Sequence, residues 1–348
     1  MKQWLLILLC FLYSSASAQP ANILFVGNSY TQMNNLCKVY QNLANSKGKN
    51  IFADILAVGG SSFKGHVLRD NTYNKFKERS WDYVILQGFS RELSEDSSII
   101  VTETIPYAQQ LIDSIKKYNP CVNIYFYLTW GYAQGFKDFS STDSYEMMQE
   151  RIQKGYLLLS NATGNFPIAP VGMVWKQVKQ KYPEVNLYSP DELHPSTYGT
   201  YLAACTFYTS LYKESSLGGV HPVQIESVIA EKIQKTSSEY VLTYYPKYNL
   251  DSIQIPSKVN QKLAFTIQEK WLSIKISGTS PFADQYFWDF GNGKTSEKRN
   301  PKYYYASPGS YSITLHIRKG CNWYTLKKNV NVSNKVKHAN RSNKSVKN

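Results

Sequence analysis

The chain has 348 residues, of which 43% are hydrophobic and 18% are charged, and its formal net charge is +14. This composition is globular and allows one large domain and one small one. The charge does not indicate a nucleic-acid-binding protein, because much of it is local, at 294–302 and in the tail 334–348, and no nucleic-acid motif is present. We expect the tail to be a basic disordered end.

Residues 1–18, MKQWLLILLCFLYSSASA, predict a secretory signal peptide. They combine a basic start, an apolar run and a small-residue ending, and they are too short for a membrane span. Leu9 is bulky where lipoprotein processing at Cys10 would need a small residue. No later stretch is apolar enough to cross a membrane, so we expect an exported protein, periplasmic or extracellular.

Four further cysteines follow the leader: Cys37, Cys121, Cys205 and Cys321. Their spacing matches no zinc site, and they are too few for a disulfide scaffold. One pair and buried free thiols both remain open. We expect no metal and no cofactor.

Apolar runs and amphipathic runs alternate between residues 22 and 213, which predicts an α/β fold with a parallel sheet covered on both faces. The expected strands are 22–27, 51–58, 82–87, 122–129 and 167–170, and the expected helices are 32–47, 98–118, 142–160, 172–182 and 196–213. Sites in such sheets form at the carboxyl ends of strands. Ser29, Gly59-Gly60, Gln87 and Trp130 all stand at such ends.

A further helix is expected at 222–241, then a linker at 242–256, and then a change to β structure. Short strands separated by Gly, Pro and Asn turns predict a small Ig-like β-sandwich over 257–333. The expected strands are 262–268, 271–278, 285–293, 311–320 and 323–332. The run Trp288-Asp289-Phe290-Gly291-Asn292-Gly293, followed by Asn300-Pro301 and by Pro308-Gly309 with Tyr311, resembles the PKD domain signature. Asn292 stands where that family usually has Asp.

The stretch 22-NILFVGNSYTQMNN-35 places Ser29 between a strand and a helix, either as a nucleophile or as a helix cap. A nucleophile needs a base and an acid, and 191-DELHP-195 provides both. The spacing of Asp191 and His194 lets the carboxylate reach the ring, fix its tautomer and stabilise the imidazolium. The joint occurrence of the two motifs favours catalysis.

Gly27-Asn28-Ser29-Tyr30-Thr31 resembles the nucleophile block of SGNH (GDSL-type) hydrolases, and Asp191 to Pro195 resembles their D-x-x-H-P block. The resemblance implies a flavodoxin-like three-layer α/β/α domain over 19–241. It also implies that Ser29 is the nucleophile, His194 the general base and Asp191 the orienting acid. The oxyanion hole would use the backbone N–H of Ser29, the N–H of Gly60 and a third side-chain amide. Here 84-VILQGFSRE-92 departs from the family's G-x-N-D block, so Gln87 is the expected third donor.

Three more residues are candidates for lining the pocket: Asn28, Trp130 and His66. Trp130 could stack on a sugar, line an acyl pocket or pack in the core, and for His66 a structural role is favoured over a place at the pocket mouth.

The sequence therefore predicts a secreted serine esterase that works through an acyl-enzyme. The Q-G-x-S block, similar to that of the sialate O-acetylesterase-like branch, together with the PKD module, favours removal of O-acetyl groups from carbohydrate. A lipase or short-chain carboxylesterase is the first alternative. A non-catalytic carbohydrate- or protein-binding protein with an adhesion-type PKD module is the second. The expected partners are an acylated carbohydrate and, for the PKD module, polysaccharide or protein; we expect a monomer.

Overall fold

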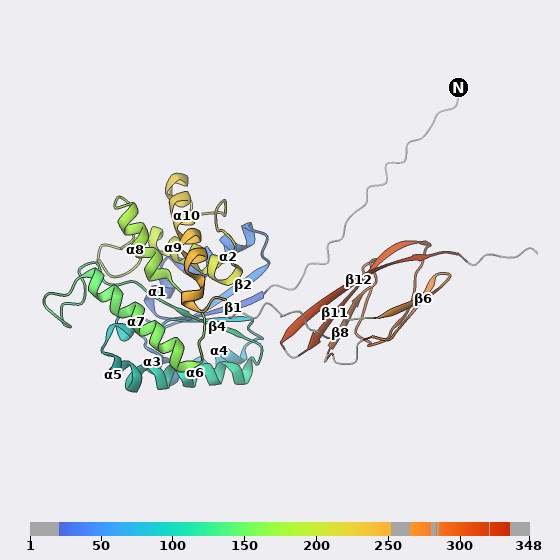
Figure 1. Ribbon diagram of the computed structural model, residues 1–348, viewed down its shortest axis with the longest axis horizontal. Helices are drawn as coiled ribbons and strands as arrows, with labels where there is room; N and C mark the ends of the chain where they lie inside the picture. Colours follow the sequence, from blue (N-terminus) through green and yellow to red (C-terminus); the bar gives the residue numbers. More distant parts are fainter. Residues whose placement is uncertain (1–20, 252–264, 280–282, 284, 320, 335–348) are drawn as a thin grey trace, which may run out of the picture. The chain divides into compact units, whose positions relative to one another are not determined.

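The computed structural model describes residues 21–251, 265–279, 283, 285–319 and 321–334 (Figure 1). The chain divides into two compact units between residues 255 and 256. The first is an α/β domain and the second is a β domain. The predicted signal peptide, the last part of the predicted linker and the tail beyond residue 334 lie outside the described residues.

The α/β domain is built on a parallel sheet of five strands in the order β2-β1-β3-β4-β5, which is the flavodoxin-like order. The strands are β1 (Ala21–Gly27), β2 (Ile51–Ala57), β3 (Tyr83–Leu86), β4 (Asn123–Tyr127) and β5 (Ile168–Ala169). Strand β1 lies between β2 and β3, and its Val26 pairs with Leu56 of β2 and with Leu86 of β3. The residues that follow these three strands therefore meet at one edge of the sheet. The predicted fold class and all five predicted strands are confirmed.

Helices cover both faces of this sheet (Figure 1). One layer holds α2 (Leu36–Ser46), α8 (Val171–Lys181), α9 (Thr197–Tyr212) and α10 (Ser227–Tyr244). The other holds α3 (Phe63–Val67), α4 (Asp70–Lys77), α5 (Ser97–Ile99), a π-helical turn (Ile100–Thr104), α6 (Ile105–Tyr118) and α7 (Tyr145–Thr163). Because both faces are covered, the strands are nearly continuous apolar runs.

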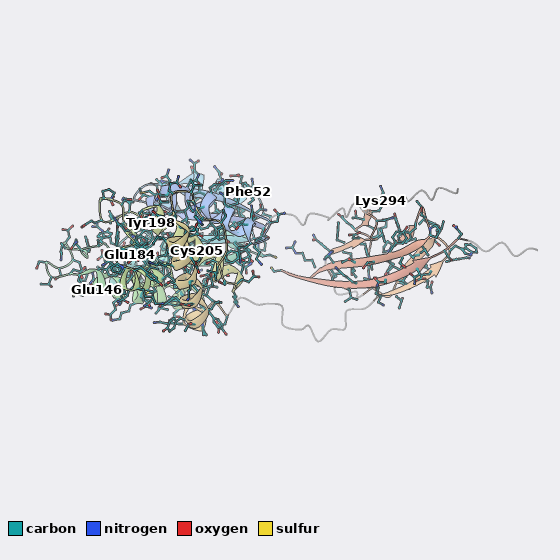
Figure 2. The ribbon with its side chains drawn as sticks, turned by 90° about the horizontal axis from the view of Figure 1, so that it is seen from above. Phe52, Glu146, Glu184, Tyr198, Cys205 and Lys294 are labelled. Atoms are coloured by element: carbon teal, nitrogen blue, oxygen red, sulfur yellow. The ribbon has the colours of Figure 1, made fainter. Side chains whose placement is uncertain are left out.

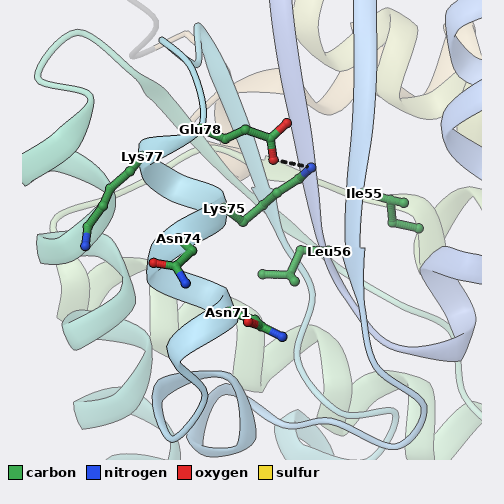
Figure 3. Close-up of a pocket in the computed structure, with 7 residues that line it drawn as sticks. All are labelled: Ile55, Leu56, Asn71, Asn74, Lys75, Lys77 and Glu78. Carbon is green, nitrogen blue, oxygen red and sulfur yellow. Dashed lines mark hydrogen bonds and ion pairs between the residues drawn. The ribbon is translucent and has the colours of Figure 1, made fainter.

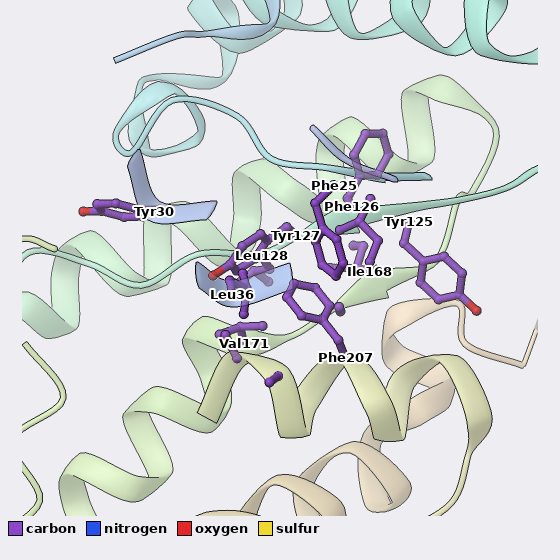
Figure 4. Close-up of a cluster of buried hydrophobic side chains, with 14 of the residues drawn as sticks. Phe25, Tyr30, Leu36, Tyr125, Phe126, Tyr127, Leu128, Ile168, Val171 and Phe207 are labelled. Atoms are coloured by element: carbon purple, nitrogen blue, oxygen red, sulfur yellow. The ribbon is translucent and has the colours of Figure 1, made fainter. Parts of the chain in front are cut away.

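The core of this domain joins β1 to α9. Phe207 of α9 receives the rings of Phe25 and Tyr127 edge-on, at centroid distances of 5.2 Å and 4.7 Å (Figure 4). Helix α9 is buried along almost its whole length and carries Cys205 as a buried free thiol (Figure 2); Cys37 of α2 is a second one. This packing fixes the strand that leads to Ser29 against the helix that follows His194.

In the α/β domain, the structure differs from the sequence prediction in two short helices and in the position of the domain end. Helices α3 and α4 were not predicted, because they are short and α4, DNTYNKFK, is mostly polar. The predicted end of the domain at residue 241 is wrong, since α10 continues to Tyr244 and a 3-10 turn follows at Tyr245–Tyr248. Tyr248 and Leu250 are fully buried, and the Tyr248 hydroxyl accepts a hydrogen bond from Gln153 Nε2 at 2.8 Å. Burial in the α/β core keeps this segment out of the linker.

The β domain consists of two antiparallel sheets, in the orders β10-β7-β6 and β12-β11-β8-β9. The strands are β6 (Thr266–Lys270), β7 (Ser273–Ser277), β8 (Gln285–Asp289), β9 (Thr295–Ser296), β10 (Lys302–Tyr304), β11 (Gly309–Lys319) and β12 (Asn322–Val332). Trp288 and Phe290 are buried between the sheets, and Trp288 Nε1 donates to the Lys298 carbonyl oxygen at 2.9 Å. The predicted sandwich is confirmed.

Candidate active site

Ser29 is the first residue of the short helix α1 (Ser29–Gln32), and only Asn28 separates it from the end of β1. Asn28, and not Ser29, caps this helix: its Oδ1 accepts a hydrogen bond from the Tyr30 backbone N–H at 3.1 Å. The Ser29 hydroxyl is therefore not needed to satisfy the helix terminus, which removes the helix-cap alternative for this residue.

The Ser29 hydroxyl contacts the ring of His194. Ser29 Oγ lies 2.8 Å from His194 Nε2, and His194 Nδ1 lies 2.6 Å from Asp191 Oδ2. A carboxylate can only accept, so the hydrogen on the imidazole ring is on Nδ1, and Nε2 is the acceptor of the serine proton. The structure thus brings together Ser29, His194 and Asp191 in one chain of hydrogen bonds.

Asp191 is held by the loop that it starts. Its Oδ1 accepts the backbone N–H groups of Leu193 at 3.0 Å and of His194 at 2.9 Å. Burial acts to raise the pKa of Asp191, but the hydrogen bonds from the His194 ring and from these two N–H groups outweigh it, and the pKa is lowered. The carboxyl is therefore ionised at neutral pH, as an imidazolium partner requires.

Gln87, at the end of β3, forms hydrogen bonds with the turn that carries Ser29. Its Oε1 accepts the Asn28 backbone N–H at 3.1 Å and the Thr31 hydroxyl at 2.7 Å. Its Nε2 donates to Asn28 Oδ1 at 2.9 Å and to the Gly88 carbonyl oxygen at 2.6 Å. Both hydrogens of the amide are used, and the side chain is fully buried. This differs from the prediction that Gln87 donates to an oxyanion: Gln87 positions the turn that carries Ser29.

Gly27 is required for this arrangement. A Cβ atom at this position would collide with Gln87 Oε1 and with Thr31 Oγ1. The absence of a side chain lets the amide approach the strand end, so the glycine of the G-N-S-x-T block has a packing role here.

Gly60 lies in a β-turn over Val58–Ser61, which directly follows β2 and is closed by a hydrogen bond from Ser61 N to Val58 O at 3.0 Å. Its φ is +66°, as the third position of a type II turn requires. Within the described parts of the chain, the backbone N–H groups of Ser29 and Gly60 have no hydrogen-bond acceptor. These two donors stand after neighbouring strands at the same edge of the sheet.

Trp130 supports the loop that carries His194. Its ring is stacked between Tyr30 and Trp175, at centroid distances of 4.5 Å and 4.1 Å. Its Nε1 donates to the Leu193 carbonyl oxygen at 3.1 Å. One side chain thus connects the residue after Ser29 to the residue before His194.

Asn34 adds a second connection, which the sequence did not signal. Its Nδ2 donates to the Pro195 carbonyl oxygen at 2.9 Å and to Thr200 Oγ1 at 3.0 Å. Asn34 has a left-handed φ of +50°, which asparagine tolerates better than most residues.

His66 binds the end of β1. The ring is fully buried, and its Nε2 lies 2.9 Å from the Gly27 carbonyl oxygen. Burial lowers the pKa of His66, so the ring is neutral and donates its Nε2–H to this carbonyl. Asn28, Trp130 and His66, the three candidates for lining a pocket, are each at most 1% exposed. This burial agrees with the structural role favoured for His66 and with the core-packing alternative for Trp130. All three form the layer beneath the site.

A cavity of about 550 Å³ lies beside β2 and α4, lined by Ile55, Leu56, Asn71, Asn74, Lys75, Lys77 and Glu78 (Figure 3). Lys75 is neutralised there, since its Nζ lies 2.7 Å from Asp54 Oδ2 and 2.8 Å from Glu78 Oε2. None of the three residues of the hydrogen-bonded chain lines this cavity, so it is separate from the candidate site.

In the described ranges, no group of three or more His, Cys, Asp or Glu side chains is placed to hold a metal ion. No described helix has both the length and the apolar character that crossing a bilayer requires.

The β domain matches a known family over most of its length: the family model for the PKD domain matches residues 271–333. Residues 271–333 are a PKD domain. The pre-pro-metalloprotease PrtV of Vibrio cholerae is 32% identical over 88 residues, which are 24% of this chain. The match spans 9% of the length of that protease. It therefore says nothing of the α/β domain that precedes the PKD domain.

The α/β domain resembles solved structures at the level of the fold. A DUF4886 family protein from Bacteroides uniformis is similar with 20% identity and a TM-score of 0.55, covering 66% of this chain and 96% of that one. The lipase/acylhydrolase from Enterococcus faecalis has 14% identity and a TM-score of 0.41, covering 55% of this chain and 95% of that one. At 20% identity, the likeness to the Bacteroides uniformis protein concerns the fold alone.

Proposed function

We propose that this protein is a serine esterase of the SGNH type, with Ser29 as nucleophile, His194 as general base and Asp191 as the orienting acid. The observation that carries the proposal is the chain Ser29 Oγ–His194 Nε2–His194 Nδ1–Asp191 Oδ2, with contacts of 2.8 Å and 2.6 Å. Asn28 caps α1 in place of Ser29, which leaves the hydroxyl available for chemistry.

The reaction has two steps. Ser29 Oγ attacks the ester carbonyl carbon while His194 Nε2 takes the hydroxyl proton, and Asp191 stabilises the imidazolium. The tetrahedral intermediate collapses, the alcohol leaves with the proton from His194, and the acyl group stays on Ser29. A water molecule then gives a proton to His194 and attacks the acyl carbon. The bond from this carbon to Ser29 Oγ breaks, His194 returns the proton to Ser29, and the acid is released.

The developing oxyanion would accept hydrogen bonds from the backbone N–H groups of Ser29 and Gly60, neither of which has an acceptor among the described residues. Gln87 takes no direct part, because its amide is committed to Asn28 and Gly88. Removing one such donor commonly lowers kcat by about 100-fold or more.

As substrates we propose O-acetyl groups on carbohydrate, with export from the cell and attachment of the PKD domain to polysaccharide or protein. The Q-G-x-S block and the presence of a PKD domain support this choice. A lipase or a short-chain carboxylesterase would use the same three residues. A binding protein without activity would have no use for the hydrogen-bonded chain.

The test uses a fluorophosphonate probe and an aryl acetate. The parent protein should become labelled and should turn over the ester, whereas Ser29→Ala should do neither. Ser98→Ala, on an exposed position of α5, is the matched control and should behave as the parent. Asp191→Asn should lower kcat by about 10,000-fold, because the amide orients the wrong tautomer. Equal labelling of parent and Ser29→Ala would sink the proposal.

Acetate release from acetylated xylan and pectin, compared with aryl esters of increasing acyl length, separates the substrate classes. Turnover that rises with chain length would favour a lipase. Release of acetate from a polysaccharide would support the carbohydrate esterase.

A further inference from the structure

Two loops lie beside the Ser29–His194 pair. One, residues 87–92, follows β3, and Asn28 Nδ2 donates to its Gly88 carbonyl oxygen at 3.3 Å. The other, residues 128–144, follows β4, and the Ala133 N–H in it donates to the Glu192 carbonyl oxygen at 3.0 Å. The loops are joined to each other by a hydrogen bond of 2.8 Å between Ser90 Oγ and the Tyr132 hydroxyl. We call these two joined loops, residues 87–92 and 128–144, the rim.

Arg91 stands on this rim with its charge unpaired. Its guanidinium carbon lies 4.7 Å from the ring centre of Phe136 and 5.5 Å from that of Phe89. The side chain is partly buried, and in the described part of the chain it has neither an ion-pair partner nor a hydrogen-bond acceptor. By contrast, Arg151 makes two contacts with Asp143, at 2.7 Å and 2.8 Å.

The backbones of the two phenylalanines whose rings contact Arg91 are held by hydrogen bonds to carboxylates. The N–H of Phe136 donates to Asp143 Oδ2 at 2.7 Å, and the Asp143 side chain is fully buried beside Arg151. The N–H of Phe89 donates to Glu92 Oε2 at 2.8 Å. The cation is therefore held in place before any ligand arrives, which lowers the entropy cost of binding.

A guanidinium between two aromatic faces keeps its N–H edge for a planar anion, and it binds carboxylate through two parallel hydrogen bonds. Water screens such a pair less where the charge is partly buried. A cation without a partner at the rim of a site is best matched by an anionic group on the substrate.

We propose that Arg91 binds a carboxylate of the substrate, so that the preferred substrates are esters of acidic carbohydrates, of the uronic acid class. This inference rests on the proposed function, since it names a substrate class for the same site. The carboxylate lies on the sugar that carries the ester or on its neighbour, and it takes no part in the bond changes at Ser29.

The experiment compares an O-acetylated methyl glucuronoside with the matching methyl glucoside, which lacks the carboxylate. The parent should prefer the acidic substrate by about 10-fold or more in kcat/KM. Arg91→Gln should lower kcat/KM for the acidic ester about 10- to 100-fold and change that for the neutral ester less than about 2-fold. Arg91→Lys should recover only part of the loss, because an ammonium cannot bind carboxylate in the same planar way.

Arg79→Gln is the matched control. Arg79 also stacks on two rings, with its guanidinium carbon 4.1 Å from the centre of Phe52 and 5.4 Å from that of Trp81. It lies at the amino ends of β2 and β3, the opposite edge of the sheet from Ser29. Its replacement should leave both substrates unaffected. Raising the salt from about 0.05 M to about 0.5 M should weaken the acidic preference of the parent.

Two outcomes would overturn the inference while leaving the esterase in place. The first is that Arg91→Gln lowers kcat/KM equally for both esters. The second is that the parent turns over an aryl acetate but does not prefer the acidic ester to the neutral one. Binding of the acidic glycoside to Ser29→Ala gives a readout that needs no turnover: it should weaken about 10-fold or more when Arg91→Gln is added. Unchanged binding would refute the role of Arg91. Absence of labelling and turnover in the parent would refute the esterase itself.

Discussion

Gln87 and Asn28 bind each other through two reciprocal hydrogen bonds, from Asn28 N to Gln87 Oε1 at 3.1 Å and from Gln87 Nε2 to Asn28 Oδ1 at 2.9 Å. The end of β3 is thereby tied to the turn that starts at the end of β1. Asn28 Oδ1 also accepts the Tyr30 N–H, so one amide pair connects the strand edge, the helix cap and Ser29.

We expect Gln87→Leu to lower stability as well as activity. The change leaves the Asn28 N–H and the Thr31 hydroxyl buried without a partner, which costs about 1–3 kcal/mol for each group. Chemical denaturation should report a lower free energy of unfolding, and aryl acetate hydrolysis a lower kcat. Gln110→Leu, on an exposed position of α6, is the control. A loss of kcat with unchanged stability would point to an oxyanion donor instead.

Gly59→Ala and Gly60→Ala should differ, although a Cβ at either position meets no atom within 4 Å. Only Gly60 has a positive φ, +66°, where alanine costs about 1–2 kcal/mol. We expect Gly60→Ala to rotate the turn, displace its N–H and lower kcat at least tenfold, while Gly59→Ala has little effect. Steady-state kinetics on an aryl acetate checks this, and similar kcat values in both variants would contradict it.

Trp130→Phe should lower activity more than stability. Phenylalanine can still stack between Tyr30 and Trp175, but it cannot donate to the Leu193 carbonyl oxygen. The loss of this bond frees the backbone before His194, and we expect kcat/KM to fall about tenfold. Trp81→Phe removes an equivalent bond, from Nε1 to the Lys75 carbonyl oxygen at 3.0 Å, at the opposite edge of the sheet. If both variants lose activity equally, Trp130 has no special connection to His194.

Glu92 should make stability depend on pH. Burial raises the pKa of Glu92 to about 7, even though the N–H groups of Phe89 and Phe63 donate to its carboxylate. The folded protein therefore binds this proton more tightly than the unfolded chain does. The contribution of Glu92 to the free energy of unfolding is largest below pH 4.5 and is lost as the pH rises through 7. Glu92→Gln should gain stability relative to the parent between pH 5 and pH 8, in urea denaturation at about these two values. Parallel pH profiles would contradict the prediction.

Trp288→Ala should destabilise the PKD domain alone. Trp288 is fully buried in a core that shares no residue with the core of the α/β domain. Loss of such a side chain costs about 3–5 kcal/mol. We expect two unfolding transitions in calorimetry, and the midpoint temperature of one of them should fall. The rate of aryl acetate hydrolysis at about 25 °C should remain unchanged. Phe207→Ala should move the other transition. A shift of both transitions in either variant would show coupled unfolding.

The strands and the pairing of the two motifs were predictable because their signals are local. Each strand of the parallel sheet is an apolar run between turns, and Asp191 and His194 lie within one short loop. The end of the α/β domain was not predictable in the same way. The stretch 245-YPKYNL-250 has the composition of a linker, and only packing against α7 and α10 decides that Tyr248 is buried.

The sequence also did not indicate how deeply the side chains of Gln87 and Trp130 are buried. An amide at the end of β3 suits either an oxyanion or a buried network, and nothing local distinguishes the two uses of Gln87. Likewise, Trp130 at a strand end can face a ligand or stack in the core. The residues that decide each case, Asn28 for Gln87 and Tyr30 with Trp175 for Trp130, are brought there by the fold.

The hydrogen bond between Ser29 and His194 joins residues 165 positions apart in the chain. The first strand of the domain supplies one partner, and the loop before α9 supplies the other. During synthesis on the ribosome, the emerging chain therefore contains Ser29 long before it contains a base. A fluorophosphonate should label nascent chains only after α9 has left the exit tunnel and packed on β1. Reactivity at Ser29 would therefore report when the α/β domain has completed folding.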